Sequence, residues 1–179
     1  DVLMGMGINL FGHNPPFIRQ AIEEQLAKGF TIGPQSELAG ETAELFCRLT
    51  GKDRVTFSNT GTEAVMTAIR IARAATGRKK IAIFAGSYHG HSDQVLNKPA
   101  SPTDLRAIPA FPGITPATAK DVVLLEYANP QSLDILRRRG RHFAAVLVEP
   151  VQSRNIYVQP RAFLRELRAI TEQTGTALI

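Results

Sequence analysis

Apolar residues recur in two different patterns along this chain of 179 residues, and each pattern predicts a different kind of element. Spacings of three and four residues are typical of helices with one apolar face, whereas short unbroken apolar runs are typical of strands covered on both faces. The helical pattern covers residues 16–28, 37–50, 64–75, 132–141 and 160–174. The strand pattern covers residues 55–58, 80–85, 121–125, 143–148 and 177–179, and the proline-containing stretch 97–119 is expected to be irregular. Because strands and helices alternate, we predict an α/β fold class with a mainly parallel sheet flanked by helices.

The turn Thr60-Gly61-Thr62-Glu63 stands between a short strand and an alanine-rich helix. A hydroxyl residue followed three positions later by glutamate fits the capping box, so the helix is expected to begin here. A helix start presents unpaired amide groups and the positive end of the helix dipole. Gly61 lets the backbone approach an anion closely, and Thr60 and Thr62 add hydroxyl donors. The turn therefore predicts a phosphate cradle, with an ordinary capped helix and no ligand as the alternative.

A second polar segment, Gly86-Ser87-Tyr88-His89-Gly90-His91, follows the unbroken apolar run 80–85. Ligands of open parallel sheets gather at the carboxyl ends of strands, so Tyr88 and His89 are expected to face a ligand. An aromatic ring at that place can lie against a flat heterocycle. The alternative is a tyrosine and a histidine packed in a loop. His89 and His91 could also form a metal pair, but no cysteine or carboxylate lies at ligand spacing nearby, so we predict no metal site.

Glu149 comes directly after the apolar run Phe143–Val148. A carboxylate at the carboxyl end of a strand lies where such sheets bind ligands, which makes Glu149 a candidate functional acid. A surface salt bridge is the alternative.

The composition is that of a chain able to bury one core, since 44% of its residues are hydrophobic. No apolar run approaches the ~20 residues that span a membrane, and residues 1–3 lack the basic start of a signal peptide. The single cysteine, Cys47, cannot form an internal disulfide, which favours a cytoplasmic protein. The net charge is +5, and the basic run 137–141 follows a helical segment without interleaved aromatic residues. We therefore predict a solvated helix end there and no nucleic-acid site.

Four motifs occur in a defined order along the chain. They are Gly12-His13-Asn14-Pro15, Asn59-Thr60-Gly61-Thr62-Glu63-Ala64, Ser87-Tyr88-His89-Gly90-His91 and Val146-Leu147-Val148-Glu149-Pro150-Val151-Gln152. This order resembles the class III (subgroup II) aminotransferases, which use pyridoxal 5′-phosphate, and most of all their glutamate-1-semialdehyde aminomutase branch. The segment 88–96 also resembles aminotransferase domains of polyketide and nonribosomal peptide synthases. The resemblance covers nearly the whole chain.

This resemblance implies a fold type I pyridoxal-phosphate-dependent transferase and gives the first polar turn a role. Thr60, Gly61 and Thr62 would hold the phosphate of the cofactor. Asn59 would help to shape the turn.

The resemblance also gives roles to the other two polar segments. Tyr88 would stack on the pyridine ring of the cofactor, with His89 beside it. Glu149 would lie near the ring and the substrate. The loop 29–36 would help to line the active site, often across the boundary between the subunits of a homodimer.

Two residues that the chemistry of the family needs have no match in this chain. They are a lysine that forms the internal Schiff base and an aspartate that pairs with the pyridinium nitrogen. In the family both come after the strand that matches residues 177–179, so we interpret the chain as an internal fragment. Residues 1–50 would be the N-terminal segment and helices leading into the large domain, and residues 51–179 the first part of that cofactor-binding domain. The isolated 179 residues are expected to be inactive.

The function predicted for the complete protein is pyridoxal-phosphate-dependent transamination between an amino donor and a carbonyl acceptor, with a carrier-protein-bound substrate as one option. Glutamate-1-semialdehyde 2,1-aminomutase-type intramolecular amino transfer uses the same cofactor residues and is an alternative. A nucleotide-binding α/β domain is a further alternative, but the chain has no Gly-x-Gly-x-x-Gly turn, and Glu63 stands where a Walker lysine would. A non-catalytic relative that serves as a scaffold is the last.

Overall fold

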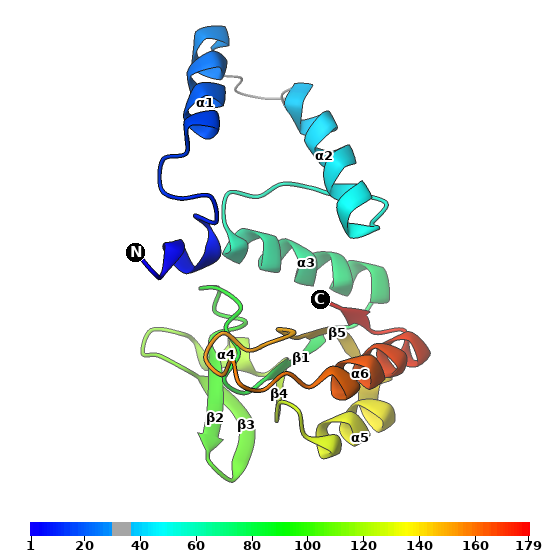
Figure 1. Cartoon of the computed structure of the whole chain (residues 1–179). Coiled ribbons are helices and arrows are strands. Elements are labelled where there is room, and N and C mark those ends of the chain that lie inside the picture. The colour runs from blue at the N-terminus through cyan, green and yellow to red at the C-terminus, as the bar shows by residue number, and fades with distance from the viewer. Residues whose placement is uncertain (30–36) are drawn as a thin grey trace. The chain divides into compact units, whose positions relative to one another are not determined.

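The structure, a computed structural model, describes residues 1–29 and 37–179. The chain divides into two compact units, residues 1–56 and residues 57–179 (Figure 1). Among the described residues, no helix is both long enough and apolar enough to cross a bilayer.

The first unit is helical. A short 3-10 turn, η1 (Met4–Gly7), precedes the helices α1 (Pro16–Lys28) and α2 (Glu37–Thr50). Proline at the first position of α1 and a φ of 95° at Gly29 delimit that helix. Both helices predicted for this part of the chain are confirmed. Of the loop 29–36 expected near the active site, residues 30–36 lie outside the described residues.

The second unit is built around a four-stranded sheet in the order β4-β1-β5-β6, and every neighbouring pair of strands is parallel. This confirms the predicted α/β class with a mainly parallel sheet. In chain order the elements are α3 (Gly61–Thr76), β1 (Lys80–Phe84), β2 (Asn97–Ser101), β3 (Asp104–Pro109), α4 (Pro116–Ala119), β4 (Val122–Leu125), α5 (Pro130–Arg139), η2 (Gly140–His142), β5 (Phe143–Leu147), α6 (Arg161–Thr174) and β6 (Ala177–Leu178).

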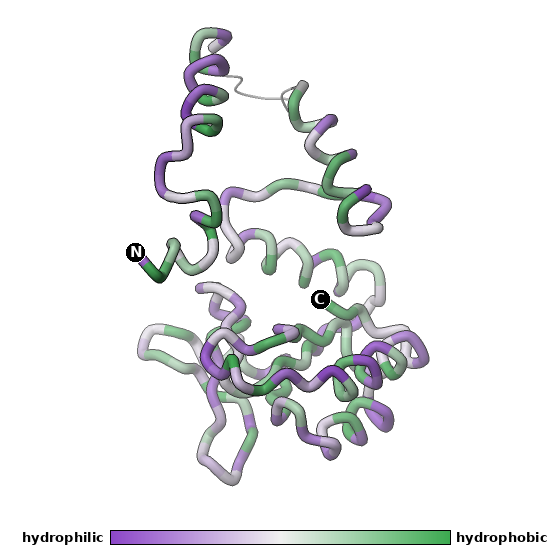
Figure 2. The backbone as a smooth tube through the Cα atoms, in the orientation of Figure 1, coloured by the Kyte–Doolittle hydropathy of each residue, from purple (hydrophilic) through white to green (hydrophobic). Residues whose placement is uncertain are grey.

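The two central strands are buried on both faces, as their unbroken apolar sequences predict. Every residue of β5 is buried, and helices cover both sides of the sheet. On one side α3 contributes Ile69 and Ala72 to the core. On the other side Leu136 of α5 and Leu167 of α6 pack in a second cluster. Figure 2 shows the apolar colour of these strands, which agrees with their burial.

The expectation that residues 97–119 are irregular was wrong. Strands β2 and β3 form an antiparallel hairpin in which Asn97 pairs with Pro109 and Pro99 with Ala107, and α4 follows it. Proline lowers the strand propensity of this stretch because it cannot donate a ladder hydrogen bond. In a two-stranded sheet each strand is an edge, so a proline can stand where no donor is required.

The strand predicted at residues 55–58 is also absent from the described part of the chain. The apolar and β-branched residues of this segment favour an extended backbone. A strand also needs a neighbour to receive its ladder hydrogen bonds, and no described residue pairs with the segment.

Arg78 ties three segments together at the amino edge of the sheet. Its guanidinium donates hydrogen bonds to the carbonyls of Phe143 (3.0 Å), Gly175 (2.9 Å) and Thr174 (3.1 Å). These bonds join the turn after α3 to the start of β5 and to the end of α6. The opposite, carboxyl edge of the sheet carries the polar motifs.

Replacing Leu167 by alanine should lower the free energy of unfolding of the complete protein by about 2–5 kcal/mol. The side chain is fully buried between α6 and the sheet, so its loss removes apolar burial and leaves a cavity. Urea denaturation measures the change. Arg165→Ala, at an exposed position of the same helix, is the matched control and should change stability by no more than about 0.5 kcal/mol. Equal losses in the two variants would contradict the packing of α6.

Candidate functional site

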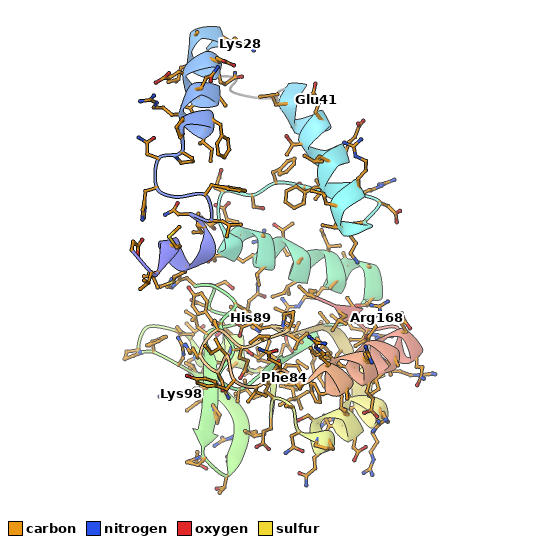
Figure 3. All side chains as sticks on the ribbon, in the orientation of Figure 1. Lys28, Glu41, Phe84, His89, Lys98 and Arg168 are labelled. Carbon is orange, nitrogen blue, oxygen red and sulfur yellow. The ribbon has the colours of Figure 1, made fainter. Side chains whose placement is uncertain are left out.

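Two loops and one helix start meet at the carboxyl edge of the sheet in the second unit. We call residues 86–91, which follow β1, the platform loop, and residues 148–154, which follow β5, the glutamate loop. The third part is the first turn of α3. Figure 3 labels Phe84, the last residue of β1, and His89 of the platform loop, which mark this edge.

The first turn of α3 is capped as the sequence predicts. The hydroxyl oxygen of Thr60 accepts a hydrogen bond from the amide of Glu63 at 3.1 Å. In return, the Glu63 carboxylate accepts from the amide of Asn59 at 2.7 Å, one residue before the capping position. Within the described residues the amides of Gly61 and Thr62 have no hydrogen-bond partner. Two unpaired donors at the positive end of a helix are a favourable place for an anion.

The platform loop rests directly on this turn. The amide of His91 donates to the hydroxyl oxygen of Thr62 at 3.1 Å. Gly90 has a φ of +94°, and a Cβ added there would lie 2.7 Å from that hydroxyl oxygen and 2.9 Å from the Thr62 Cα atom. The close approach therefore requires glycine. It leaves a cavity of about 320 Å³ lined by Gly61, Thr62, Val65, Tyr88, His89 and Gly90.

Tyr88 and His89 differ in what surrounds them. Tyr88 is 42% exposed, and its ring meets the His91 ring edge-on with the centroids 5.9 Å apart. The guanidinium carbon of Arg154 lies 6.0 Å from the Tyr88 ring centroid. The Nε2 atom of His89 is buried and has no hydrogen-bond partner among the described residues. Burial lowers the pKa of His89, and the negative charge of Glu149 opposes this only in part. His89 is therefore held as a neutral imidazole with one ring nitrogen available to a ligand.

Glu149 joins the two loops through backbone groups. One carboxylate oxygen accepts from the amide of Tyr88 and the other from the amide of Ser153, both at 3.1 Å. No salt bridge involves Glu149 among the described residues, so the alternative of a surface ion pair finds no support. Its negative charge lies close to His89. Its hydrogen bond to the Tyr88 amide holds the platform loop in place.

Two further residues of this edge were not predicted from the sequence. Gln152 is only 5% exposed, and its side-chain amide donates to the Ala85 carbonyl and the Ser87 hydroxyl, both at 2.9 Å. The Tyr127 hydroxyl donates to the carbonyls of Glu149 (3.1 Å) and Pro150 (2.9 Å), and burial is the main reason its pKa is raised. Their hydrogen bonds join segments that are distant in the chain, so local patterns do not reveal them. The position of Gln152 within the Glu-Pro motif was the only sequence signal for either residue.

The candidate residues fall into three groups. Gly61, Thr62, Tyr88 and His89 line one cavity, whereas Thr60 and Glu149 hold the walls of that cavity in place through hydrogen bonds. Asn59 lies on the other side of the turn, where it lines a separate cavity of about 380 Å³ with Glu63 and Arg70. The binding roles expected for these residues stay predictions.

Comparison with known proteins covers the whole chain. The family described as Aminotransferase class-III matches residues 1–179. The glutamate-1-semialdehyde 2,1-aminomutase of Chloroflexus aggregans is 38% identical over 182 residues, which cover 100% of this chain and 42% of that protein. This chain therefore spans about two fifths of the length of that curated relative.

Solved structures agree with this match. A structure described as a transaminase with PLP bound superposes with a TM-score of 0.83 at 33% identity, over 93% of this chain and 40% of that one. A glutamate-1-semialdehyde aminomutase from Pseudomonas aeruginosa in complex with PMP has a TM-score of 0.85 at 26% identity, over 98% of this chain and 39% of that one.

Gly90→Ala should destabilise the complete protein by about 1–3 kcal/mol more than Gly113→Ala. Both glycines have nearly the same positive φ, +94° and +92°, but a Cβ at Gly113 would meet nothing within 4 Å, whereas one at Gly90 would clash with Thr62. The difference between the two variants in chemical denaturation therefore isolates the contact between the platform loop and α3. Equal destabilisation would mean that this contact is not tight.

The buried imidazole of His89 should make the stability of the complete protein depend on pH. Because burial lowers its pKa in the folded state, the unfolded chain takes up a proton near pH ~6.5 before the folded chain does. The free energy of unfolding should therefore fall as the pH drops from about 7.5 to about 5.5. His89→Gln should lose this part of the dependence in denaturation curves recorded across that range. An unchanged pH profile in the variant would show that His89 is accessible to protons in the folded protein.

Proposed function

This chain belongs to the class III aminotransferase family, and we propose that the complete protein transfers an amino group between an amino donor and a carbonyl acceptor with pyridoxal 5′-phosphate. One observation carries the proposal. The unpaired amides of the α3 start and the aromatic platform loop surround a single cavity at the carboxyl edge of a parallel sheet.

The residues at the start of α3 fit a phosphate group. Gly61 and Thr62 offer two amide donors at the positive end of the helix. The hydroxyl oxygen of Thr62 already accepts from His91, which leaves its hydrogen free to donate to an anion. The Thr60 oxygen caps Glu63 instead, so we assign the main hydroxyl contact to Thr62 and a positioning role to Thr60.

The platform loop fits the flat part of the same cofactor. Tyr88 would lie against the ring, and the neutral His89 would exchange a hydrogen bond with a polar ring substituent. Glu149 would fix the position of Tyr88 relative to the cofactor ring, because its carboxylate accepts a hydrogen bond from the Tyr88 amide. When bound, pyridoxal phosphate supplies the electron sink that eases bond changes at the amine-bearing carbon of the substrate.

The proposal needs groups that the resemblance places after Ile179. They are the lysine that carries the cofactor and the aspartate at its pyridinium nitrogen. A homodimer, a cytoplasmic location and a substrate delivered by a carrier protein belong to the same proposal.

Intramolecular amino transfer is the second candidate, and the 38% identity to an aminomutase favours it. The two reactions differ in the number of substrates. A transaminase needs a separate amino donor and carbonyl acceptor, whereas an aminomutase converts one amino-carbonyl compound into its isomer. No observation favours a nucleotide-binding domain once the family is known.

The test of function is to load the complete protein with pyridoxal phosphate and supply amino donors and carbonyl acceptors separately and together. Product formed only when both are present supports transamination. Isomerisation of glutamate-1-semialdehyde without a second substrate supports the aminomutase. Absence of cofactor binding would overturn both.

Thr62→Ala should weaken the binding of pyridoxal phosphate by the complete protein by about tenfold or more. A hydrogen bond to a charged group contributes about 1.5–3 kcal/mol, and 1.4 kcal/mol corresponds to a tenfold change in affinity. Fluorescence titration of the cofactor measures the change. Thr62→Ser keeps the hydroxyl and should bind nearly as the wild type does. Thr118→Ala is the matched control, since the Thr118 hydroxyl donates only to the Thr115 carbonyl. Unchanged affinity of Thr62→Ala would remove Thr62 from the phosphate site.

A further inference from the structure

A second cavity shares the platform loop with the first. It measures about 450 Å³ and lies between that loop, strand β2, the end of the β2–β3 hairpin and the glutamate loop. Tyr88 and His89 line both cavities, so each stands as a wall between them. A ligand in the second cavity would therefore adjoin the place proposed for the cofactor ring.

The charged side chains that line this second cavity are all positive. Lys98 of β2 and Arg154 of the glutamate loop line it, and no carboxylate is among its lining residues within the described part of the chain. Neither cation forms an ion pair with another described residue, whereas Arg137 of α5 is paired with both Asp134 and Glu166. Two cations that line one cavity and have no ion-pair partner among the described residues attract an anionic group.

Part of the remaining lining is apolar. Leu96 and Phe111 line the cavity, and Phe111 is 60% exposed. An apolar chain placed there would cover the Phe111 ring and gain from leaving water. The lining of the cavity thus combines apolar side chains with two cations.

One buried polar atom that belongs to this cavity alone lacks a hydrogen-bond partner among the described residues. It is the side-chain oxygen of Asn97, and Asn97 lines the second cavity but not the first. An unsatisfied buried polar atom typically costs about 1–3 kcal/mol, which a ligand can recover by supplying a hydrogen bond. This observation is independent of the charges and points to a bound ligand as well.

We propose that this cavity is a substrate site for an apolar chain that carries an anionic group, with Arg154 and Lys98 binding the anion. The planar guanidinium of Arg154 suits the two oxygens of a carboxylate or a phosphate ester, and its position 6.0 Å from the Tyr88 ring places it next to the cofactor cavity. Lys98 adds a point charge from strand β2. The inference rests on the proposed function, since it makes Tyr88 and His89 the boundary between substrate and cofactor.

The test uses small probes that share one chain length. Hexanoate and hexyl phosphate carry the two kinds of anion, and hexanamide is the neutral equivalent. Calorimetric titration of the complete protein measures the dissociation constant of each probe, with and without pyridoxal phosphate. Four variants are compared with the wild type: Arg154→Gln, Arg154→Lys, Lys98→Gln and, as the matched control, the exposed Arg165→Gln of α6.

Arg154→Gln should weaken the binding of at least one of the two anionic probes by about tenfold or more and leave hexanamide within about twofold, because a charge-assisted bond is lost. Lys98→Gln should show the same selectivity with a smaller loss. Arg154→Lys should recover much of the affinity, and Arg165→Gln should match the wild type. The probe that suffers the larger loss identifies the anion as a carboxylate or a phosphate ester.

Two results would overturn the proposal. One is equal weakening of hexanamide and the anionic probes by Arg154→Gln, which would mean that the side chain shapes the cavity without binding charge. The other is unchanged binding of both anions in Arg154→Gln and Lys98→Gln. The titrations without cofactor separate this outcome from a failure of the proposed function, because the anion site can be measured even if pyridoxal phosphate does not bind.

Discussion

The burial of β5 and of residues 81–84 of β1 is the constraint on which the second unit depends. Strands with apolar side chains on both faces need a helix on each side, and parallel neighbours satisfy this arrangement. Parallel strands release all their following loops at the same edge. The polar segments after β1 and β5, about 60 residues apart in the chain, are brought together for that reason.

At this edge, hydrogen bonds between loops rather than apolar packing hold the site residues in position. Glu149 and Gln152 bind backbone groups of the loop after β1, and Thr62 binds the amide of His91. Each bond joins segments that differ in chain position by roughly 30 residues or more. The positions of Tyr88 and His89 are therefore set from both sides, by the glutamate loop and by the start of α3.

The two cavities that share Tyr88 and His89 differ in the ligand groups that their linings suit. The first has the amide donors of a helix start, which suit a phosphate. The second is lined by apolar side chains and by two cations without an ion-pair partner among the described residues, which suit a chain with an anionic group. His89 stands between them as a buried neutral imidazole. A neutral imidazole at this position can form a hydrogen bond with a ligand in either cavity.

By itself, the sequence determined the local features of this protein. The apolar runs identified β1, β4 and β5, the periodicity identified α1, α2 and α6, and the hydroxyl–glutamate spacing placed the cap of α3 at Thr60. These features arise from interactions within a few residues, which the order of side chains reveals directly. The motifs also indicated the family, because four local patterns in one order are a specific combination.

Only the tertiary structure decided what depends on contacts between distant segments. The prolines of β2 and β3 are unfavourable in most strands, but each of these strands is an edge of a two-stranded hairpin. The apolar segment 55–58 forms no strand because no described residue pairs with it. Gln152 and Tyr127 were missed because their partners are remote in sequence. Lys98 and Arg154 belong to different elements, and both line the second cavity. No local sequence pattern predicts that they line the same cavity.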